Sequence, residues 1–241
     1  MTLVWRPGYL AEGDPYFSNV SLLLHGNGTN GSTTITDNSP APKNVTPVGN
    51  AQISTAQSAF TGGSSIAFDG TEDYLTVPST GTPGDLGAGD FTVELWHFLV
   101  SRLNSFPCLI SNYSSFAAGS FGLFAGHISS TTTKYQLALN GSGFPSINST
   151  ANISYNQWVH LAVVRSGSTI TLYVDGISSG STTNTATLSG TSGSLWVGTA
   201  GDGVASGAIN GYIDDLRITK GVARYTSNFT PPDAPFPDAQ Y

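Results

Sequence analysis

The segment WVHLAVVRSGSTITLYVDG, from Trp158 to Gly176, decides the fold class of this chain. It holds two runs rich in β-branched and aromatic residues, 158–165 and 169–174, separated by a connection that contains Ser166 and Gly167. An Asp-Gly pair, Asp175-Gly176, follows the second run. Short connections that contain glycine are typical of the tight turns between antiparallel strands. We therefore predict a β-hairpin at this position.

Similar short runs recur on both sides of the hairpin, separated by turn-forming residues. Many short strands with turns between them are typical of a β-sandwich. The predicted strands outside the hairpin are 20–24, 65–68, 74–77, 91–100, 121–125, 135–139, 194–197 and 211–218. The segments 26–39, 178–193 and 199–207 are rich in Ser, Thr and Gly, and we predict surface loops there. We expect an all-β fold, a two-sheet antiparallel sandwich formed by residues 19–220.

Both ends of the chain have the composition of extended arms. Residues 1–18 show neither helical nor strand periodicity, and this arm has two open placements, on its own sandwich or on a neighbouring subunit. A single helical turn is predicted at 221–225, within a C-terminal segment 221–241 whose later part is rich in proline, which cannot donate to a sheet. The predicted assembly contacts of the two arms are Trp5, Tyr9, Tyr16, Phe17, Phe229 and Phe236.

Composition excludes several classes of partner. The chain has 241 residues and a net charge of −7, and its eight Lys and Arg residues form no basic cluster, which excludes nucleic acid as the main partner. Cys108 is the one cysteine, so no disulfide forms within the chain.

The first ten residues lack the apolar run of a signal peptide, and no window approaches the length of a membrane span. We predict no membrane insertion.

Several segments together resemble the concanavalin A-like lectin/glucanase fold in its laminin-G-like branch. They are residues 21–25 with 37–39, 65–70 with 73–78, 90–96, 158–165 with 172–176, and 211–218. The closing segments 213–225 and 228–232 resemble those of laminin-G-like domains in virion proteins of tailed bacteriophages. The resemblance implies a concanavalin A-like jelly roll with a structural role on the virion, as a capsid decoration or tail-fibre component made in the host cytoplasm. It also implies other virion proteins and further copies of this chain as partners.

The alternative function is a carbohydrate-binding module for host or environmental glycans. Strand alternation places Glu94 and Trp96 on the face opposite Phe91, Val93 and Leu95. Sugar sites combine an aromatic platform with a few polar groups. The predicted glycan contacts are Glu94, Trp96, Tyr113, Phe116 and Trp196. For Glu94, the other interpretation is a carboxylate that is hydrogen-bonded within the sandwich.

Catalytic patterns are missing from the sequence. Retaining glycosidases of this fold need two carboxylates about 5–5.5 Å apart, yet the glutamates are only Glu12, Glu72 and Glu94, with no Glu-x-Asp-x-Glu spacing. Asp214 and Asp215 are adjacent and are expected on opposite faces of a strand. The histidines at 25, 97, 127 and 160 lack zinc-ligand spacing, and no Gly-x-Ser-x-Gly elbow occurs. We predict no catalytic residue and no enzymatic activity.

Calcium is the cofactor that the resemblance implies, because many members of this fold hold a structural Ca²⁺ with Asp side chains and loop carbonyls. The candidate ligands are Asp37, Asp69, Asp73, Asp214 and Asp215. In the alternative interpretation these carboxylates cap turns or pair with Arg217 and Arg165.

Overall fold

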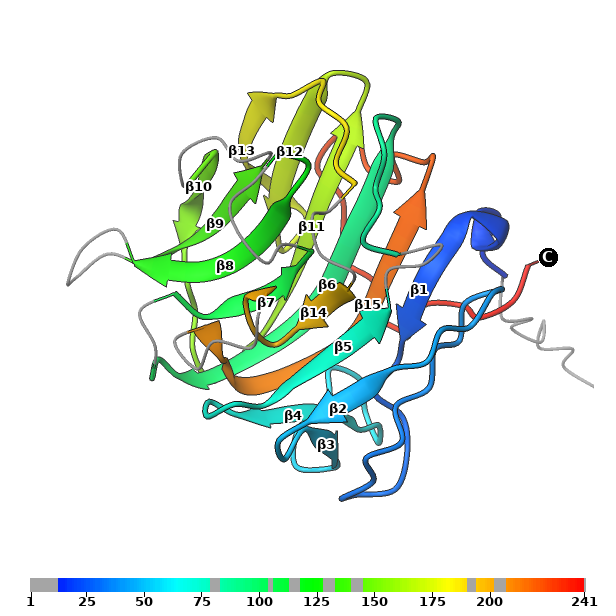
Figure 1. The fold of residues 1–241 in the computed structure, drawn as a ribbon, viewed down its shortest axis with the longest axis vertical. Helices are drawn as coiled ribbons and strands as arrows, with labels where there is room; N and C mark the ends of the chain where they lie inside the picture. The colour runs from blue at the N-terminus through cyan, green and yellow to red at the C-terminus, as the bar shows by residue number, and fades with distance from the viewer. Residues whose placement is uncertain are drawn as a thin grey trace, which may run out of the picture.

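Two antiparallel β-sheets stack face to face in the computed structural model of the chain (Figure 1). The structure describes residues 13–78, 83–103, 106–112, 118–127, 133–139, 145–189, 194–201 and 207–240. One short 3-10 helix, η1 (Phe17–Asn19), precedes the first strand. The predicted all-β, two-sheet antiparallel sandwich is therefore confirmed. In the part of the chain that the structure describes, no helix has the length and apolar character needed to cross a bilayer.

The first sheet, here called sheet A, carries the longest strands. Its order across the sheet is β13 (Ile177–Thr183), β12 (Thr169–Val174), β11 (Trp158–Ser166), β6 (Phe91–Ser101), β15 (Asn210–Lys220), β4 (Ser65–Asp69) and β3 (Gln52–Ser54). β1 (Val20–Leu24) also pairs with β15: it contacts residues 216–219, just after residues 210–213, which pair with β4.

The second sheet, sheet B, covers one face of sheet A. Its order is β10 (Ile147–Asn152), β9 (Thr133–Leu139), β8 (Phe121–His127), β7 (Cys108–Ser111), β14 (Ser194–Val197), β5 (Tyr74–Pro78) and β2 (Thr46–Val48). Sheet B lies in front of the long strands of sheet A in Figure 1. The face of sheet A that points away from sheet B is here called the outer face of sheet A.

The predicted hairpin is confirmed, and its neighbour extends it. β11 and β12 pair in register from Leu161 opposite Val174 to Ser166 opposite Thr169, and Gly167 in the turn has a φ of +58°. β13 falls largely in a segment that was predicted as a loop from residue 178, and this prediction is wrong. The Ser- and Thr-rich segment pairs with β12 because that strand offers unpaired backbone groups at the sheet edge.

Strand alternation fills the space between the sheets. In β6, Phe91, Val93 and Leu95 share one face as predicted; this face points into the core, while Glu94 points to the outer face. His97 continues the inward set, and its ring lies 5.3 Å from that of Tyr135 in sheet B. The core therefore includes one imidazole among aliphatic side chains.

A β-bulge in β15 changes which side chains reach the outer face. Ile213 and Leu216 are both fully buried in the core although they are three residues apart. The pairing of β15 with β6 shifts between Asp214 and Arg217, and Asp215 has a φ of +48°. Both aspartates, 214 and 215, therefore lie outside the core. The expectation that they point to opposite faces of a regular strand is wrong.

After β15 the chain crosses the outer face of sheet A as an extended segment, residues 221–240, here called the C-terminal strap. The predicted helical turn at 221–225 is absent, because Arg224 N donates to Thr92 Oγ1 on β6 instead of closing a helical turn. Phe236 is buried against Val20 and Leu23 of β1. In Figure 1 the end of the chain accordingly lies close to β1.

Candidate functional site

A buried ionic network joins the C-terminal strap to sheet A. Arg217 donates from Nε and Nη2 to Glu94 Oε1 at 3.0 and 2.8 Å, and Tyr225 Oη donates to Glu94 Oε2 at 2.8 Å. Asp14 accepts from Arg217 Nη1 at 3.1 Å. Asp14 also accepts from Arg224 Nη1 and Nη2 at 3.0 and 2.6 Å. The network thus ties together the N-terminal arm, two strands and the strap.

This network occupies the carboxylate that was predicted to contact glycans. Glu94 has no exposed surface, and burial alone would raise its pKa, but the charge of Arg217 lowers it to about 2. His160 Nε2 adds a contact at 3.5 Å from Oε2. Glu94 is thus an ionised structural group beneath the strap, as in the hydrogen-bonded interpretation, and its oxygens are not available to a ligand.

The aromatic residues of the predicted glycan set do not come together. Trp96 lies on the outer face of sheet A, where its ring contacts those of Phe60 and His160. Trp196 lies on β14 of sheet B between the buried Leu195 and Val197. Its side chain therefore points away from the core, to the outer face of sheet B, whereas Trp96 lies on the outer face of sheet A. Tyr113 and Phe116 lie outside the described residues. Sequence alternation places a side chain on a face but does not say which of two sheets a strand joins.

The described arm aromatics pack mostly on their own domain. Phe17 packs with the cluster around Phe236, and the Phe236 ring also lies 3.7 Å from the guanidinium of Arg217. Phe229 stacks on Tyr225 with ring centroids 3.5 Å apart. Tyr16 is 45% exposed. Trp5 and Tyr9 lie outside the described residues. Phe17, Phe229 and Phe236 thus each pack against other residues of the chain, and Phe17 and Phe229 are only partly buried.

The five aspartates proposed for calcium do not fit one ion. Asp37 caps a turn by accepting from the backbone N–H groups of Leu23, Ser39 and Lys43. Asp73 is 1% exposed, and its two oxygens accept from the backbone N–H groups of Asn50 and Asp69. Within the described residues no group of three or more His, Cys, Asp or Glu side chains is placed to hold a metal. Asp37 and Asp73 therefore both bind backbone N–H groups of turns, as in the interpretation in which these carboxylates cap turns.

Two of the remaining three candidates, Asp214 and Asp215, lie at the bulge, and the third, Asp69, lines a surface depression. Asp214 accepts from Ala59 N at 2.9 Å, and burial raises its pKa to about 7. Asp215 pairs with His25 Nδ1 and accepts from Phe236 N at 2.6 Å. Burial alone would lower the pKa of His25, but its hydrogen bond to Asp215 raises it. Of the two roles in the alternative interpretation, turn capping or pairing with Arg217 and Arg165, neither aspartate has the arginine pairing; Asp214 holds the loop at Ala59, and Asp215 holds the strap at Phe236.

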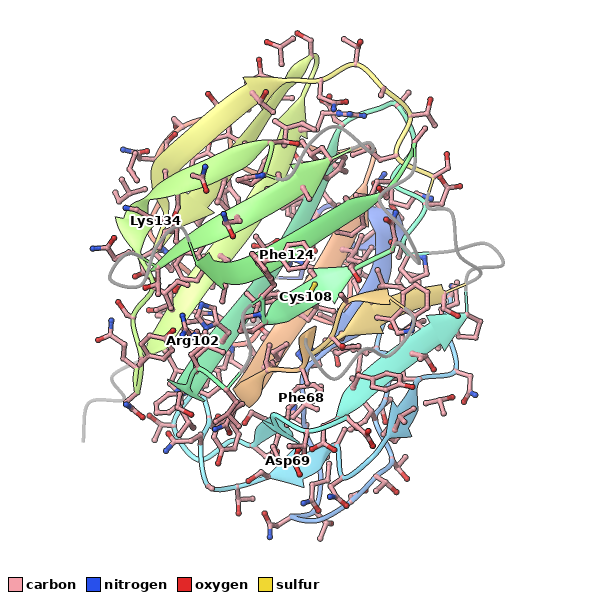
Figure 2. All side chains as sticks on the ribbon, turned by 60° about the vertical axis from the view of Figure 1, so that its left-hand side comes forward. Phe68, Asp69, Arg102, Cys108, Phe124 and Lys134 are labelled. Carbon is pink, nitrogen blue, oxygen red and sulfur yellow. The ribbon has the colours of Figure 1, made fainter. Side chains whose placement is uncertain are left out.

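A depression on the outer face of sheet A was not found from the sequence. Ala67 on β4 lies opposite Gln52 on β3 and Tyr212 on β15, and its short side chain leaves a gap between the two larger ones. The depression has a volume of about 430 Å³. Its walls are Asn50, Gln52, Ala67, Phe68, Asp69, Asp73, Val100, Asn210 and Tyr212. Figure 2 shows Asp69 at the lower end of the sandwich, below the labelled Cys108 and Phe124, and Phe68, the residue before it on β4, is buried in the core.

Polar groups in this depression are held in fixed positions. Asp69 Oδ1 accepts from Thr71 N and Oγ1 at 2.7 Å, while Oδ2 lies 3.5 Å from Asn50 Nδ2. Burial alone would raise the pKa of Asp69, but the hydrogen bonds from Thr71 lower it. Asn210 Nδ2 donates to Ser101 Oγ at 2.9 Å. An ionised carboxylate and two side-chain amides therefore stand beside the ring of Tyr212.

Three solved structures have this architecture at low sequence identity. Domain 4 of AbnA, a GH43 extracellular arabinanase from Geobacillus stearothermophilus, solved with arabinotriose, has a TM-score of 0.60 at 16% identity over 85% of this chain and 94% of that chain. The binding domain of Paraclostridial Mosquitocidal Protein 1 gives 0.62 at 15% over 85% and 49%. The binding domain of Botulinum Neurotoxin DC in complex with SialylT gives 0.56 at 14% over 84% and 48%. The chain spans about half the length of these two toxin chains.

The family assignment comes from the sequence itself. No curated protein sequence matches the chain. A family model described as the concanavalin A-like lectin/glucanases superfamily matches residues 69–224, which include β5 to β15 and the first residues of the strap. This match and the two-sheet sandwich agree with the resemblance drawn from the strand motifs. The chain belongs to the concanavalin A-like lectin/glucanases superfamily.

Proposed function

We propose that this chain is a non-enzymatic carbohydrate-binding module that holds its ligand in the depression on the outer face of sheet A. The observation that carries the proposal is the lining of this depression, where the Tyr212 ring stands beside Asn50, Asn210 and the carboxylate of Asp69. Its volume of about 430 Å³ is in the usual range for small-molecule sites. An aromatic wall with a few fixed polar groups suits the apolar face and the hydroxyl groups of a sugar.

The carboxylates of the depression support binding over hydrolysis. Glycosidases act with two carboxyl groups that flank the scissile bond. Here Asp69 is exposed, whereas Asp73 is buried with both oxygens engaged by backbone N–H groups. One accessible carboxylate is enough to accept hydrogen bonds from sugar hydroxyls but does not supply an acid and a base. Two of the similar solved structures are binding domains, which agrees with this proposal.

The test is a glycan array with the purified chain, followed by calorimetric titration of each hit. Tyr212→Ala is expected to weaken binding by about tenfold, the effect of losing one well-packed aromatic contact of about 1.4 kcal/mol. The matched control is Trp196→Ala, which removes a half-buried aromatic residue from the outer face of sheet B. An array without any hit, or equal losses in both variants, would refute the site.

We further propose, from a separate observation, that the module is carried on a virion as a capsid decoration or tail-fibre component. The closing segments 213–225 and 228–232 support this, because they resemble those of virion laminin-G-like domains and here form the end of β15 and the strap. The chain is then expected in mass spectra of purified particles and in pull-downs with other capsid or tail proteins. Failure to copurify with virions, together with no affinity for those proteins, would sink this assignment.

A further inference from the structure

One transverse row of side chains on the outer face of sheet A leads into the depression. The strand registers align Trp158 of β11 with Phe98 of β6, Phe98 with Tyr212 of β15, Tyr212 with Ala67 of β4, and Ala67 with Gln52 of β3. Five strands thus each contribute one outward side chain. With about 4.8 Å between strands, the row is about 19 Å long.

The first three members of the row are aromatic and half-buried. The ring centroid of Phe98 lies 5.7 Å from that of Trp158 and 5.9 Å from that of Tyr212. These contacts hold each ring in place without covering it completely. Neighbouring rings are tilted by 60° and 76° to each other, so the row continues the Tyr212 wall of the depression as a line of aromatic rings that present both edges and faces.

The C-terminal strap sets one limit of this surface. The neighbouring row holds Trp96 and His160, whose rings contact Phe60 and Phe229 respectively. The row beyond that contains Glu94 and is covered by the ionic network. The row that starts at Trp158 lies on the other side of Trp96, away from that network.

The side chains of the row are uncharged, and the charged residues that line the depression are aspartates. None of the nine residues that line the depression is Lys or Arg, and its exposed carboxylate, Asp69, has a lowered pKa. Trp158 and Phe98 add no charge. An anionic sugar placed here would meet a carboxylate without a compensating cation, and the chain as a whole carries a net charge of −7.

From these observations we infer that the ligand is an extended, uncharged oligosaccharide that lies across the strands, with one end in the depression and successive sugars on Tyr212, Phe98 and Trp158. The inference rests on the proposed carbohydrate-binding function and adds the length and charge class of its ligand. Trp158 is then a remote contact that only a ligand of several sugars reaches.

Calorimetric titration with linear neutral oligosaccharides of one to six sugars, derived from arabinan, xylan and glucan, tests the length. For the wild-type chain, affinity is expected to rise with each added sugar until the row is filled. Trp158→Ala is expected to weaken binding of the longest oligosaccharide by about tenfold and to leave the shortest bound ligand unchanged. Trp196→Ala, on sheet B, is expected to change neither.

The outcomes separate the two proposals. If no sugar binds to the wild-type chain, the proposed function fails. If sugars bind but affinity is independent of length and of Trp158, the extended row is refuted while the module stands. Equal affinity for a sialylated and an uncharged oligosaccharide of the same length would overturn the charge class. The length series needs no variant, so it decides the question even where Trp158→Ala does not fold.

Discussion

Replacing His97 with leucine is expected to change how stability depends on pH. His97 points into the core from β6, has no exposed surface, and neither ring nitrogen has a hydrogen-bond partner within the described residues. Burial, together with the charge of His160, lowers its pKa from 6.5 to about 3. Between about pH 3 and pH 6.5 the imidazole is therefore neutral in the folded protein while it is protonated in the unfolded chain.

The sign and size of the effect follow from proton linkage. Between the two pKa values of His97, the unfolded chain binds more protons at this residue than the folded chain does. The contribution of His97 to folding stability therefore falls as pH falls. At pH 5, which is 1.5 units below the unfolded pKa of 6.5, this amounts to about 2 kcal/mol. Leucine has no titrating group and removes the effect.

Urea unfolding of both proteins at about pH 7.5 and about pH 5 measures this difference. The stability of His97→Leu relative to the wild type is expected to rise by about 2 kcal/mol between the two conditions. A paired comparison is needed because Asp214 acts in the opposite direction within the same pH range. A difference that does not change with pH would show that His97 is hydrated or hydrogen-bonded in the folded protein, and would refute the reasoning.

Two further perturbations address the bulge and the strap. The pKa of Asp214 is raised from 3.8 to about 7, so its contribution to stability is fully present below pH 3.8 and is lost as pH rises through 7. Asp214→Asn is therefore expected to stabilise the protein by about 3 kcal/mol more at pH 8 than at pH 5, in paired urea titrations. Arg217→Met leaves the Glu94 carboxylate buried without its main partner and is expected to cost about 3–5 kcal/mol. The exposed Arg102→Met serves as its control, and equal melting temperatures of these two variants would contradict a structural role for the network.

Local patterns predicted the parts of the fold that depend on neighbouring residues. The hairpin from Trp158 onward was predicted because alternation and turn glycines are local signals. The bulge had a signal that went unused: Ile213 and Leu216 are three residues apart, and Ile218 follows two residues later. A regular strand does not place the first two on the same face, so this spacing indicates an extra residue. β13 had no such signal, because its pairing depends on an available edge.

The site was harder to predict because its residues meet only through strand register. Ala67 has no chemistry of its own, yet its place between Gln52 and Tyr212 makes the depression. These residues come from three strands that are distant in sequence, and no motif encodes their alignment. Glu94 was the opposite case, since it carries a prominent functional group but points beneath the strap. Residue type alone therefore pointed to a carboxylate that the strap covers.

The strap and the proposed ligand row divide one sheet face between them. Glu94 and Arg217 are covered by Tyr225 and Arg224, so the charged half of the face is already matched by the chain's own strap. The aromatic members of the row carry no charge, and Phe229 of the strap contacts the neighbouring row at His160. Loss of the strap would therefore expose the charged side chains of Glu94 and Arg217 on the same sheet face as the row. The proposed preference for an uncharged glycan thus requires the strap as well as the residues that would touch the ligand.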